Sequence, residues 1–470
     1  MLVMKFGGTS VGDAQCFARV KEIIAGAARE HPPVVVVVSA MSTVTEALLE
    51  SARLAARGLD DPLKEKQRSL VQKHLHVIEA LFTGETRDEV RKTALDILAE
   101  FQRLCQGMAL LAEQPPQALD AALSVGERLS AAILARYLQE SGVPAQAVDA
   151  AQCLVTDDQF GSARPLMDDT REAMRRVLLP LTEKKCVPVV TGFNGATRQG
   201  LRTTIGRGGS DYSAAIVAGA LDADELWIWT DVDGVLSADP KAVGEALILE
   251  RLTYEEAAEL SYMGAKVLHA KTLAPLLARM IPVYIKNTFA PEKPGTCIGP
   301  PQEGRQRGPK AVTSTAPVTM ITLRSNGTPG ATELFARTFE ALFHAHVDIL
   351  MVSQASYQDS FCVLLPQAMS ARATEALRQA FRLELNHHYL QPLEIQDVAA
   401  IALIGEGMKG IPGIAARLFG ALGREKINVI VIAQGSSESN ISLVVSPEDR
   451  QAAVRAIHQE FIIPAAARAS

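Results

Sequence analysis

The sequence predicts an α/β protein in which a mostly parallel sheet covered by helices is followed by two small modules of the ferredoxin-like order βαββαβ. Three observations predict this fold. Short apolar runs alternate with amphipathic helical patterns over residues 1–300. The composition then shifts to Pro, Gly, Gln, Arg and Lys at residues 291–317, as expected of a linker. Beyond it, a pattern of glycine, phenylalanine and glutamine occurs twice, 80 residues apart.

Six apolar runs of the N-terminal part have the length and the flanking turn residues of strands. They are residues 2–6, 34–39, 145–149, 187–192, 226–230 and 283–286. Helical patterns separate these runs, and the stretch 64–112 is long enough for a helical hairpin. Because strands alternate with helices, the sheet should be largely parallel and covered on both faces.

Glycine and polar clusters follow the predicted strands. They are Gly7-Gly8, Ser39 and residues 124–127, 192–195, 203–211 and 230–234. In an open sheet of this kind, ligands bind beyond the carboxyl ends of the strands. We therefore expect one cleft to gather the clusters.

The first cluster has the features of a phosphate site. The chain turns on Gly7-Gly8 and enters a helical pattern, and such a turn leaves backbone N–H groups for an anion. Lys5 adds a positive charge beside the turn. Candidate helix caps follow at Thr9, Ser10 and Asp13. The spacing is not that of a Walker P-loop, and a plain tight turn is the alternative for this cluster taken alone.

Two further clusters carry cations. Arg207 lies in a glycine-rich loop at 203–211, where its planar fork suits a carboxylate or phosphate. Lys266 follows a glycine that breaks a helical pattern at 262–269. A flexible turn and a solvated lysine are the alternatives for these residues. Phosphoryl transfer needs positive charge around the transferred group, and Lys5, Arg207 and Lys266 could supply it.

Acidic side chains occur in two of the clusters. Asp231 and Asp233 end a strand, where they could bind Mg²⁺ with phosphate or hydrogen-bond a ribose, or form an ordinary Asp-Gly turn. Glu127 opens a helix, where it could complement the helix N-terminus or bind a substrate ammonium group. No Ser-His-Asp order and no metal-type His/Cys spacing stands out in the sequence.

Length, charge and cysteine usage restrict the class of protein. A chain of 470 residues should form two or three domains. The net charge of −6 argues against a nucleic-acid-binding protein, and no apolar run approaches the ~18 residues that span a bilayer. The six cysteines lie far apart without a C-x-x-C pair, as in a reducing compartment. We expect a cytoplasmic protein that binds neither nucleic acid nor membrane.

The repeat beyond the linker predicts a βαββαβ module present twice. The first copy contains Gly327, Gly330, Phe339, Ala341-Leu342, Asp348 and Gln354, and the second contains Gly407, Gly410, Phe419, Ala421-Leu422, Asn428 and Gln434. Residues 405–410 also match G-x-G-x-x-G, the pattern of a dinucleotide fold. We reject that interpretation because the next strand ends in Gln434 rather than an acid, and too few residues remain for such a domain.

Four motifs resemble those of aspartate kinases and occur in that family's order. They are Lys5-Phe6-Gly7-Gly8-Thr9-Ser10-Val11, Gly206-Arg207-Gly208-Gly209-Ser210-Asp211-Tyr212, Thr230-Asp231-Val232-Asp233-Gly234-Val235 and Met263-Gly264-Ala265-Lys266-Val267-Leu268-His269. The repeated module resembles the family's tandem ACT domains. Residues 427–438 resemble the threonine-regulated branch, including the kinase part of bifunctional aspartate kinase–homoserine dehydrogenases. The chain ends where that dehydrogenase would begin, so the resemblance implies the kinase alone or a fragment of a longer protein.

The resemblance covers essentially the whole chain and implies a domain order. An amino-acid-kinase domain would occupy residues 1–299, a linker 300–316, a first ACT domain 317–397 and a second 398–470, threaded into the first. It implies ATP- and Mg²⁺-dependent phosphorylation of the side-chain carboxylate of L-aspartate to 4-phospho-L-aspartate, the first step towards lysine, threonine and methionine. It also implies feedback inhibition by an amino acid, with threonine favoured over lysine, and a homo-oligomer, a dimer or tetramer, formed through the ACT domains.

The resemblance also implies roles for particular residues. Catalysis would depend on Lys5, Arg207, Asp211 and Lys266, with Lys5 bridging phosphate and substrate. Aspartate would be bound by Ser39, Thr45, Glu127, Phe193, Arg207, Ser210 and Asp211, with Arg207 pairing a carboxylate and Glu127 and Asp211 receiving the ammonium. The nucleotide would be held by Lys5, Gly7, Gly8, Thr230, Asp231, Leu236, Lys241, Lys266 and Val267. Effector binding would involve Asp348, Gln354, Gly410, Asn428 and Gln434.

Some positions depart from the family's pattern. Leu236 and Lys241 stand where the family often has tyrosine and arginine, and Tyr357-Gln358 replaces a Ser-Glu pair in the first ACT copy. We therefore expect effector binding at Gln434 before Gln354. Two rival hypotheses are another amino-acid kinase, such as a glutamate kinase, and a catalytically silent amino-acid sensor that uses only the ACT repeat. The first is disfavoured by Ser39, Thr45, Glu127 and Arg207 together, and the second by the three cations Lys5, Arg207 and Lys266.

Overall fold

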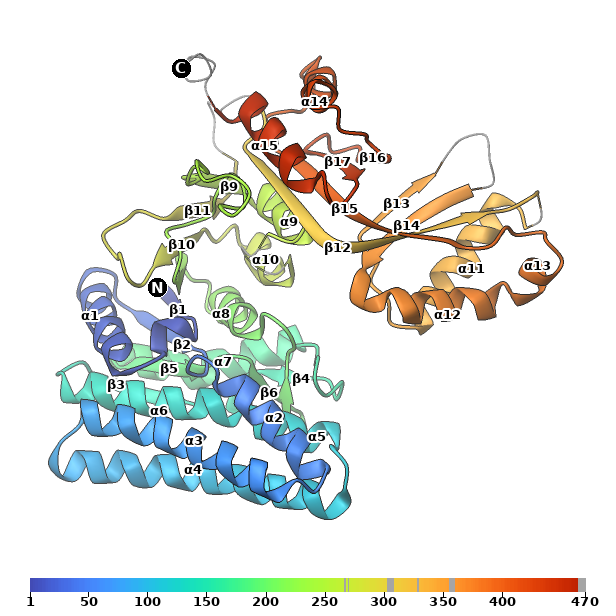
Figure 1. The fold of residues 1–470 in the computed structure, drawn as a ribbon. Coiled ribbons are helices and arrows are strands. Elements are labelled where there is room, and N and C mark those ends of the chain that lie inside the picture. The colour runs from blue at the N-terminus through green and yellow to red at the C-terminus, as the bar shows by residue number, and fades with distance from the viewer. Residues whose placement is uncertain (266–267, 269, 302–307, 328, 355–359, 464–470) are drawn as a thin grey trace. The chain divides into compact units, whose positions relative to one another are not determined.

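The computed structural model describes residues 1–265, 268, 270–301, 308–327, 329–354 and 360–463 (Figure 1). The chain forms two compact units. The first contains Met1–Val235, Glu250–Tyr254 and Leu268–Pro300. The second contains Leu236–Leu249, Glu255–Val267 and Pro301–Ser470, as far as these segments are described.

The first unit is built on an eight-stranded sheet with the order β3-β5-β2-β1-β8-β10-β11-β9. The strands are β1 (Leu2–Phe6), β2 (Val34–Val38), β3 (Ala145–Val148), β5 (Val187–Thr191), β8 (Glu225–Thr230), β9 (Arg251–Thr253), β10 (Val283–Asn287) and β11 (Thr296–Gly299). All neighbouring pairs are parallel except β10 and β11. This confirms the predicted, largely parallel sheet and all six predicted strands.

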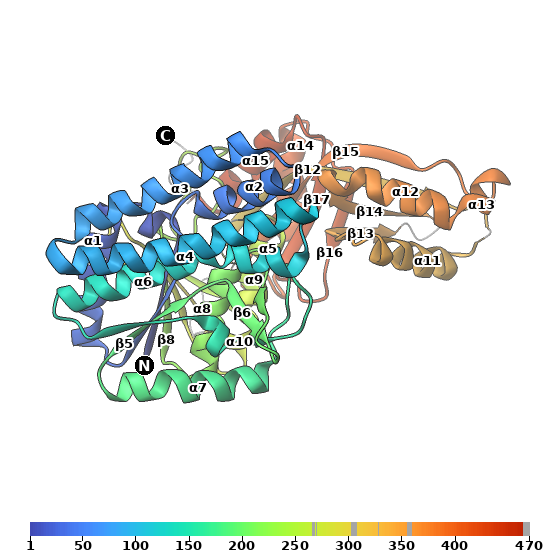
Figure 2. The same ribbon diagram turned by 90° about the horizontal axis from the view of Figure 1, so that it is seen from below.

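The central strands are apolar along their whole length because both faces of the sheet are covered. Every residue of β1, β2 and β5 is buried. Figure 2 shows α6 on one side of the strands, with α3 and α4 beyond it, and α7 and α8 on the opposite side. The helices of this unit are α1 (Ala14–Glu30), α2 (Val44–Ala56), α3 (Asp60–Leu81), α4 (Gly84–Leu111), α5 (Pro116–Leu123), α6 (Val125–Glu140), α7 (Met167–Glu183), α8 (Gly209–Ala220) and α10 (Ala270–Leu277). The pair α3 and α4 is the helical hairpin expected at 64–112.

Three short strands form a second sheet that the sequence analysis did not predict. They are β4 (Val155–Thr156), β6 (Asn194–Thr197) and β7 (Arg202–Thr204), in the order β4-β6-β7. Two turns of 3₁₀ helix, η1 (Thr9–Val11) and η2 (Ala150–Gln152), complete the unit. The hairpin of β6 and β7 ends two residues before Gly206, so it fixes where the glycine-rich loop begins.

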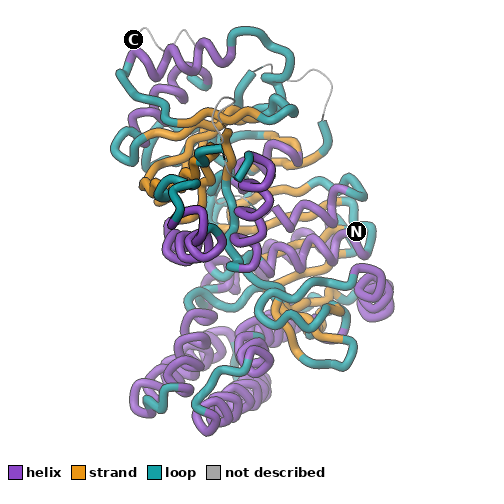
Figure 3. The backbone as a smooth tube through the Cα atoms, turned by 90° about the vertical axis from the view of Figure 1, so that its right-hand side faces the viewer, coloured by secondary structure: helices purple, strands orange, loops and turns teal. Residues whose placement is uncertain are grey.

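The second unit contains a six-stranded antiparallel sheet with the order β13-β14-β12-β15-β17-β16 (Figure 3). The strands are β12 (Ala311–Arg324), β13 (Met351–Gln354), β14 (Ser360–Pro366), β15 (Glu394–Ile404), β16 (Val431–Gln434) and β17 (Asn440–Val445). The helices are α9 (Tyr254–Tyr262, of which Tyr254 belongs to the first unit), α11 (Ala331–His344), α12 (Ser370–Ala380), α13 (Arg382–Asn386), α14 (Ile414–Arg424) and α15 (Arg450–Phe461), with the 3₁₀ turn η3 (Gln367–Met369).

The 80-residue repeat is visible in this sheet. The strand–helix–strand–strand order of β12, α11, β13 and β14 recurs in β15, α14, β16 and β17. The matched glutamines Gln354 and Gln434 are the last residues of β13 and β16. Each copy has its own apolar core, one around Leu334 and Phe381 and the other around Leu418 and Ile457.

The long strand β12 contributes to both apolar cores, Ile321 and Leu323 to one and Val312 to the other. The register of β12 against β15 shifts between Thr315 and Val318, which divides β12 into two segments. Its first segment starts at Ala311, inside the stretch 291–317 whose composition is that of a linker. Residues 311–315, with Val312 among threonine and serine, are a possible strand pattern. The pattern is too short to predict a strand next to so many Pro, Gly and Arg residues.

Two properties bear on the class of protein. None of the helices in the described part of the chain has the length and apolarity that crossing a bilayer requires. All six cysteines are free, and four of them are buried. The four buried cysteines therefore pack as small apolar side chains.

Candidate active site

A cavity of about 580 Å³ lies at the carboxyl ends of β1, β2, β5 and β8 in the first unit. Its lining comes from five loops and the first turns of the helices that follow them. The residues are Lys5, Gly7, Gly8, Thr9, Ser39, Ala40, Met41, Ser42, Thr43, Thr45, Glu46, Glu127, Phe193, Gly206, Arg207, Gly208, Gly209, Ser210, Asp211, Thr230 and Asp231. This confirms that one cleft gathers the clusters at the strand ends.

The turn after β1 is held close to the loop that follows β2. The Ser42 N–H donates to the Gly8 carbonyl at 3.0 Å. A Cβ on Gly8 would lie 2.9 Å from the Ala40 carbonyl oxygen, so only glycine permits this approach. Of the candidate caps, Asp13 is the one that caps α1, where it accepts the Cys16 N–H at 2.8 Å. That hydrogen bond holds the pKa of Asp13 below its usual value.

Lys5 lies on β1 in the centre of the sheet and is only 7% exposed. Its Nζ is 2.5 Å from Oδ1 of Asp211, which lies in the first turn of α8. The ion pair joins two residues that are 206 positions apart in the sequence and neutralises a nearly buried ammonium. The structure therefore brings two of the predicted catalytic residues into direct contact.

The glycine-rich loop carries Arg207 into the cavity. Gly206 and Gly208 have φ angles of +80° and +72°, a left-handed conformation that side chains disfavour. Arg207 between them is exposed and forms no ion pair with a described residue. Its guanidinium is available to a carboxylate or a phosphate. Ser210 and Asp211 follow at the start of α8 and line the same cavity.

Glu127 is the buried acid of the cavity. It lies in the first turn of α6 and is 3% exposed. Burial raises the pKa of Glu127 to about 8, although a hydrogen bond from the Ala40 N–H opposes that shift. Its Oε2 has no hydrogen-bond partner among the described residues. A buried carboxyl oxygen without a partner, facing a polar cavity, suits an incoming ammonium group.

The remaining predicted aspartate-site residues lie in the same cavity. Ser39 lies on the loop after β2, Thr45 lies in the first turn of α2, and Phe193 follows β5 with a φ of +66°. Residues 40–43 also line the cavity, and the sequence did not point to them. The only signal for them was their place after the carboxyl end of a strand.

The turn after β8 contributes one carboxylate to the cavity. Thr230 and Asp231 line it, and the Thr230 hydroxyl donates to Asp231 at 3.2 Å. Asp233 is held elsewhere, because Lys293 and Asn287 each approach its carboxylate to 2.6 Å. The Lys293 ammonium lowers the pKa of Asp233. Of the two acids, Asp231 therefore lines the cavity, whereas Asp233 is held by Lys293 and Asn287.

Four residues predicted for the nucleotide site are not among the cavity lining. Lys266 and Val267 lie outside the described residues. Leu236 and Lys241 belong to the second unit. No group of three or more His, Cys, Asp or Glu side chains arranged as a metal site occurs in the described part of the chain.

The predicted effector residues lie at corresponding places in the two copies of the module. Asp348, Gln354, Asn428 and Gln434 are all exposed. The strands β13 and β16, which end in the two glutamines, are the two edge strands of the sheet. Although they are not hydrogen-bonded neighbours in the strand order, they are in contact with each other. The Gly410 N–H donates to Glu438 at 2.8 Å.

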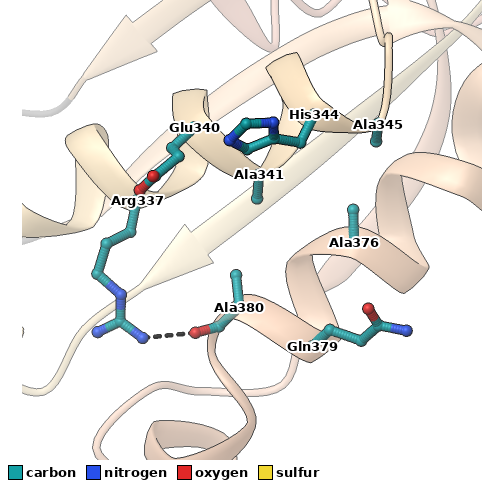
Figure 4. Close-up of a pocket in the computed structure, with 8 residues that line it drawn as sticks. All are labelled: Arg337, Glu340, Ala341, His344, Ala345, Ala376, Gln379 and Ala380. Carbon is teal, nitrogen blue, oxygen red and sulfur yellow. Dashed lines mark hydrogen bonds between the residues drawn. The ribbon is translucent and has the colours of Figure 1, made fainter.

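A second hollow, of about 570 Å³, lies between α11 and α12 (Figure 4). Alanines on both helices leave this space open. Its cation, Arg337, is bound to the Ala380 carbonyl and pairs with Glu333 and Glu384. The hollow therefore offers less free charge than the cavity in the first unit.

Comparison with known proteins places the chain in a family. A model of the amino acid kinase family matches residues 1–287, and a model of an ACT domain matches residues 401–461. The bifunctional aspartokinase/homoserine dehydrogenase of Haemophilus influenzae is 34% identical over 466 residues, which are 98% of this chain and 56% of that protein. Chloroplastic aspartokinase 1 of Arabidopsis thaliana is 32% identical over 469 residues, which are 98% of this chain and 80% of that protein. The chain spans about half the length of the bifunctional relatives that it matches.

Two solved structures resemble the whole chain. E. coli aspartokinase III in complex with aspartate and ADP, in the R-state, has a TM-score of 0.84 at 28% identity and covers 98% of this chain and 99% of that one. The same enzyme in complex with lysine and aspartate, in the T-state, has a TM-score of 0.78 at 30% identity and covers 98% and 100%. These findings confirm the resemblance carried by the four sequence motifs. The chain belongs to the amino acid kinase family and, within it, to the aspartokinases.

Proposed function

We propose that this chain phosphorylates L-aspartate with ATP. The bond between the γ-phosphorus of ATP and its bridging oxygen breaks, an oxygen of the aspartate side-chain carboxylate bonds to that phosphorus, and ADP leaves. The product is 4-phospho-L-aspartate. The observation that carries the proposal is the single cavity in which Lys5, Arg207, Glu127 and Asp211 meet.

The charges of the cavity suit the two ends of an amino acid. Glu127 offers a partnerless buried oxygen, and Asp211 lies nearby on α8; both are acceptors for the ammonium group. Arg207 is exposed, and its planar guanidinium can bind a carboxylate through two hydrogen bonds. Lys5 lies between Asp211 and the turn Gly7-Gly8, where its charge offsets the charge that develops on the transferred phosphoryl group.

The nucleotide would lie at the ends of β1 and β8. The backbone of Gly7 and Gly8 suits phosphate oxygens, and Thr230 and Asp231 line the same cavity. Mg²⁺ usually binds through substrate phosphates and one or two carboxylates, and Asp231 is an exposed carboxylate there. Bound Mg²⁺ would neutralise phosphate charge. Lys266, Val267, Leu236 and Lys241 remain proposed members of this nucleotide site.

Regulation by an amino acid is the second part of the proposal. The E. coli relative forms a complex with lysine as well as aspartate, and an ACT domain matches residues 401–461 of this chain. We favour threonine as the inhibitor, with lysine as the alternative, bound near Gln434, Asn428 and Gly410. The corresponding residues Asp348 and Gln354 would belong to a first ACT domain at 317–397, between a linker at 300–316 and a second ACT domain at 398–470. Assembly as a dimer or tetramer through these domains is also proposed.

One assay tests the activity. Purified protein is mixed with ATP, Mg²⁺ and aspartate, ADP release is coupled to NADH oxidation, and hydroxylamine traps the acyl phosphate as a hydroxamate. We expect ADP and hydroxamate to form in equal amounts with aspartate and not with glutamate. Turnover with glutamate would indicate another amino-acid kinase. Binding of threonine without any turnover would indicate a sensor protein.

A further inference from the structure

The loop between β2 and α2 contains a strained residue at the wall of the cavity. Thr43 has a φ of +67° and a ψ of −5°, a left-handed conformation that is unusual for a β-branched side chain. Ser42 and Thr43 both line the cavity. Such a conformation persists only where the surroundings impose it. The structure should therefore contain a group that holds this turn.

Lys73 is that group. It lies on α3, outside the cavity, and its Nζ donates to the Ser42 carbonyl at 2.5 Å and to the Thr43 hydroxyl at 3.2 Å. It forms no ion pair with a described residue, and both of its hydrogen bonds to described residues go to this turn. From the other side, the Ser42 N–H donates to the Gly8 carbonyl. The turn is thus fixed between the phosphate-side glycines and a cation on the helical hairpin.

The same loop also supports the buried acid of the site. The Ala40 N–H donates to the Glu127 carboxylate, two residues before Ser42. Ser39 and Thr45 flank the turn and line the cavity. A shift of the turn would therefore move both the proposed aspartate-binding hydroxyls and the donor that orients Glu127.

We propose that Lys73 is a positioning residue for aspartate, because it holds the Ser42–Thr43 turn in the conformation that the substrate pocket needs. The proposal rests on the proposed function for its kinetic consequence. Lys73 does not touch the reacting atoms. Its effect should be larger on aspartate than on ATP, since Ser39 and Thr45 flank the turn, whereas Thr230 and Asp231 lie on a different loop and the turn meets the nucleotide side through the Gly8 carbonyl.

The first test compares Lys73→Met with Lys64→Met. Lys64 lies on the same helix, is exposed and lines a separate shallow hollow. We expect Lys73→Met to raise the KM for aspartate about tenfold, the effect of losing a hydrogen bond to a charged group, with the KM for ATP changed less than about twofold. Lys73→Arg, which keeps a donor and the charge, should recover part of the loss. Equal increases in both KM values, or kinetics like those of Lys64→Met, would overturn the proposal.

The second test asks whether Lys73 acts by holding a strained backbone. Glycine adopts a positive φ without strain. Adding Thr43→Gly to the Lys73→Met protein should therefore lower its raised KM for aspartate part of the way back to the wild-type value. We expect the two substitutions to be clearly non-additive. Additive losses would show that Lys73 does not act through this turn.

A third measurement needs no activity. Amide hydrogen exchange of residues 40–46 should be faster in Lys73→Met than in Lys64→Met, while exchange in β1 and β2 stays the same. If the wild-type protein phosphorylated no aspartate, the proposed function would fail, and this exchange difference would still decide whether Lys73 holds the loop. Unchanged exchange would contradict the proposal on its own.

Discussion

Arg207 is the exposed cation of the cavity, and its place between two left-handed glycines leaves its guanidinium without a described ionic partner. We expect Arg207→Ala to raise the KM for aspartate by about ten- to a hundredfold, because a bidentate pair with a carboxylate would be lost. The KM for ATP should change little. The KM for aspartate of Arg207→Lys should lie between those of the wild type and Arg207→Ala, because lysine keeps the charge but lacks the planar guanidinium. Steady-state kinetics with each substrate varied in turn would measure this, and a larger effect on ATP would move Arg207 to the nucleotide side.

Glu127 gives a pH-dependent prediction. Burial raises its folded-state pKa to about 8, from 4.5 as a free group. The unfolded chain therefore loses this proton first, and the free energy of unfolding should fall as the pH rises from 4.5 to about 8. Glu127→Gln removes the ionisable group. The free energy of unfolding of the variant, relative to that of the wild type, should therefore rise by roughly 1 kcal/mol per pH unit over that window.

Urea unfolding of both proteins at several pH values measures that difference directly. Below pH 4.5 the two proteins should be about equally stable, because the carboxyl is then protonated in both states of the wild type. Saturating aspartate should reduce the gap at pH 8, since its ammonium would pair with the ionised carboxylate. A gap that does not depend on pH would refute the assignment.

At this scale the sequence predicts residue types better than residue roles. It indicates a Lys5 cluster, an Arg207 loop and an acid at 127, but it cannot choose between Asp231 and Asp233. That choice depends on Lys293 and Asn287, which lie more than fifty positions away and become neighbours only in the folded sheet. The sequence does not indicate the role of Lys73 for the same reason. A lysine on an amphipathic helix looks like any solvated lysine until the fold places a strained turn beneath it.

Among the structural elements, the β1–α1 turn shows why a glycine is needed in one place and not in another. A Cβ on Gly8 would meet the Ala40 carbonyl at 2.9 Å, whereas Gly26, inside α1, has no neighbour within 4 Å. Gly8→Ala should cost about 1–3 kcal/mol in unfolding free energy and most of the activity, because two cavity loops must separate. Gly26→Ala should stabilise the protein by about 0.5–1 kcal/mol, since glycine weakens a helix interior.

Thermal unfolding and the aspartate-dependent assay together check this pair. Both substitutions add the same methyl group to the same strand–turn–helix segment, so Gly26→Ala controls for the chemistry of the change. A Gly8→Ala protein that is as stable and as active as Gly26→Ala would contradict the close packing of the two loops.

The sequence predicts the long apolar elements well and the short polar ones poorly. The strands β1, β2 and β5 have runs of Val, Leu or Met and are buried along their whole length, so their pattern is strong. β4, β6 and β7 are two to four residues long and contain threonine, glycine and arginine, a composition typical of loops. Their pairing depends on distant contacts, for example the buried Asp120 carboxylate, which accepts the Thr204 and Gly161 N–H groups at 2.8 Å.

On the scale of the whole molecule, the chain does not divide into units at a single boundary. Residues 236–249 follow the cavity residue Asp231 closely in sequence, yet they pack in the second unit. Within that unit Ala238 and Val243 join the core around Leu418, and the Ser237 hydroxyl lies 2.9 Å from Nε2 of His458. Composition along the sequence cannot predict that 236–249 belong to the second unit, because no local pattern distinguishes these residues from those of the first unit.

The repeat makes regulation testable with a built-in control. Gln434 and Gln354 end matching strands, and both are exposed. Gln434→Ala should weaken inhibition by threonine by about tenfold, as expected for loss of a ligand hydrogen bond, with the uninhibited rate unchanged. Gln354→Ala should have a smaller effect. Inhibition curves with threonine and with lysine would measure both, and an unchanged curve for Gln434→Ala would remove this residue from the effector site.

The central claim is that loops from β1, β2, β5 and β8 form one phosphoryl-transfer site around Lys5, and the turnover number of Lys5→Met tests it most directly. With ATP and aspartate both saturating, we expect kcat to fall by at least about a hundredfold, because the charge that offsets the developing phosphate charge is removed. Because the substitution leaves Asp211 without its partner, the variant should melt at a lower temperature than the wild type, so kcat is measured well below the melting temperature of both proteins to exclude unfolding. A Lys5→Met protein with near-normal kcat would contradict the account.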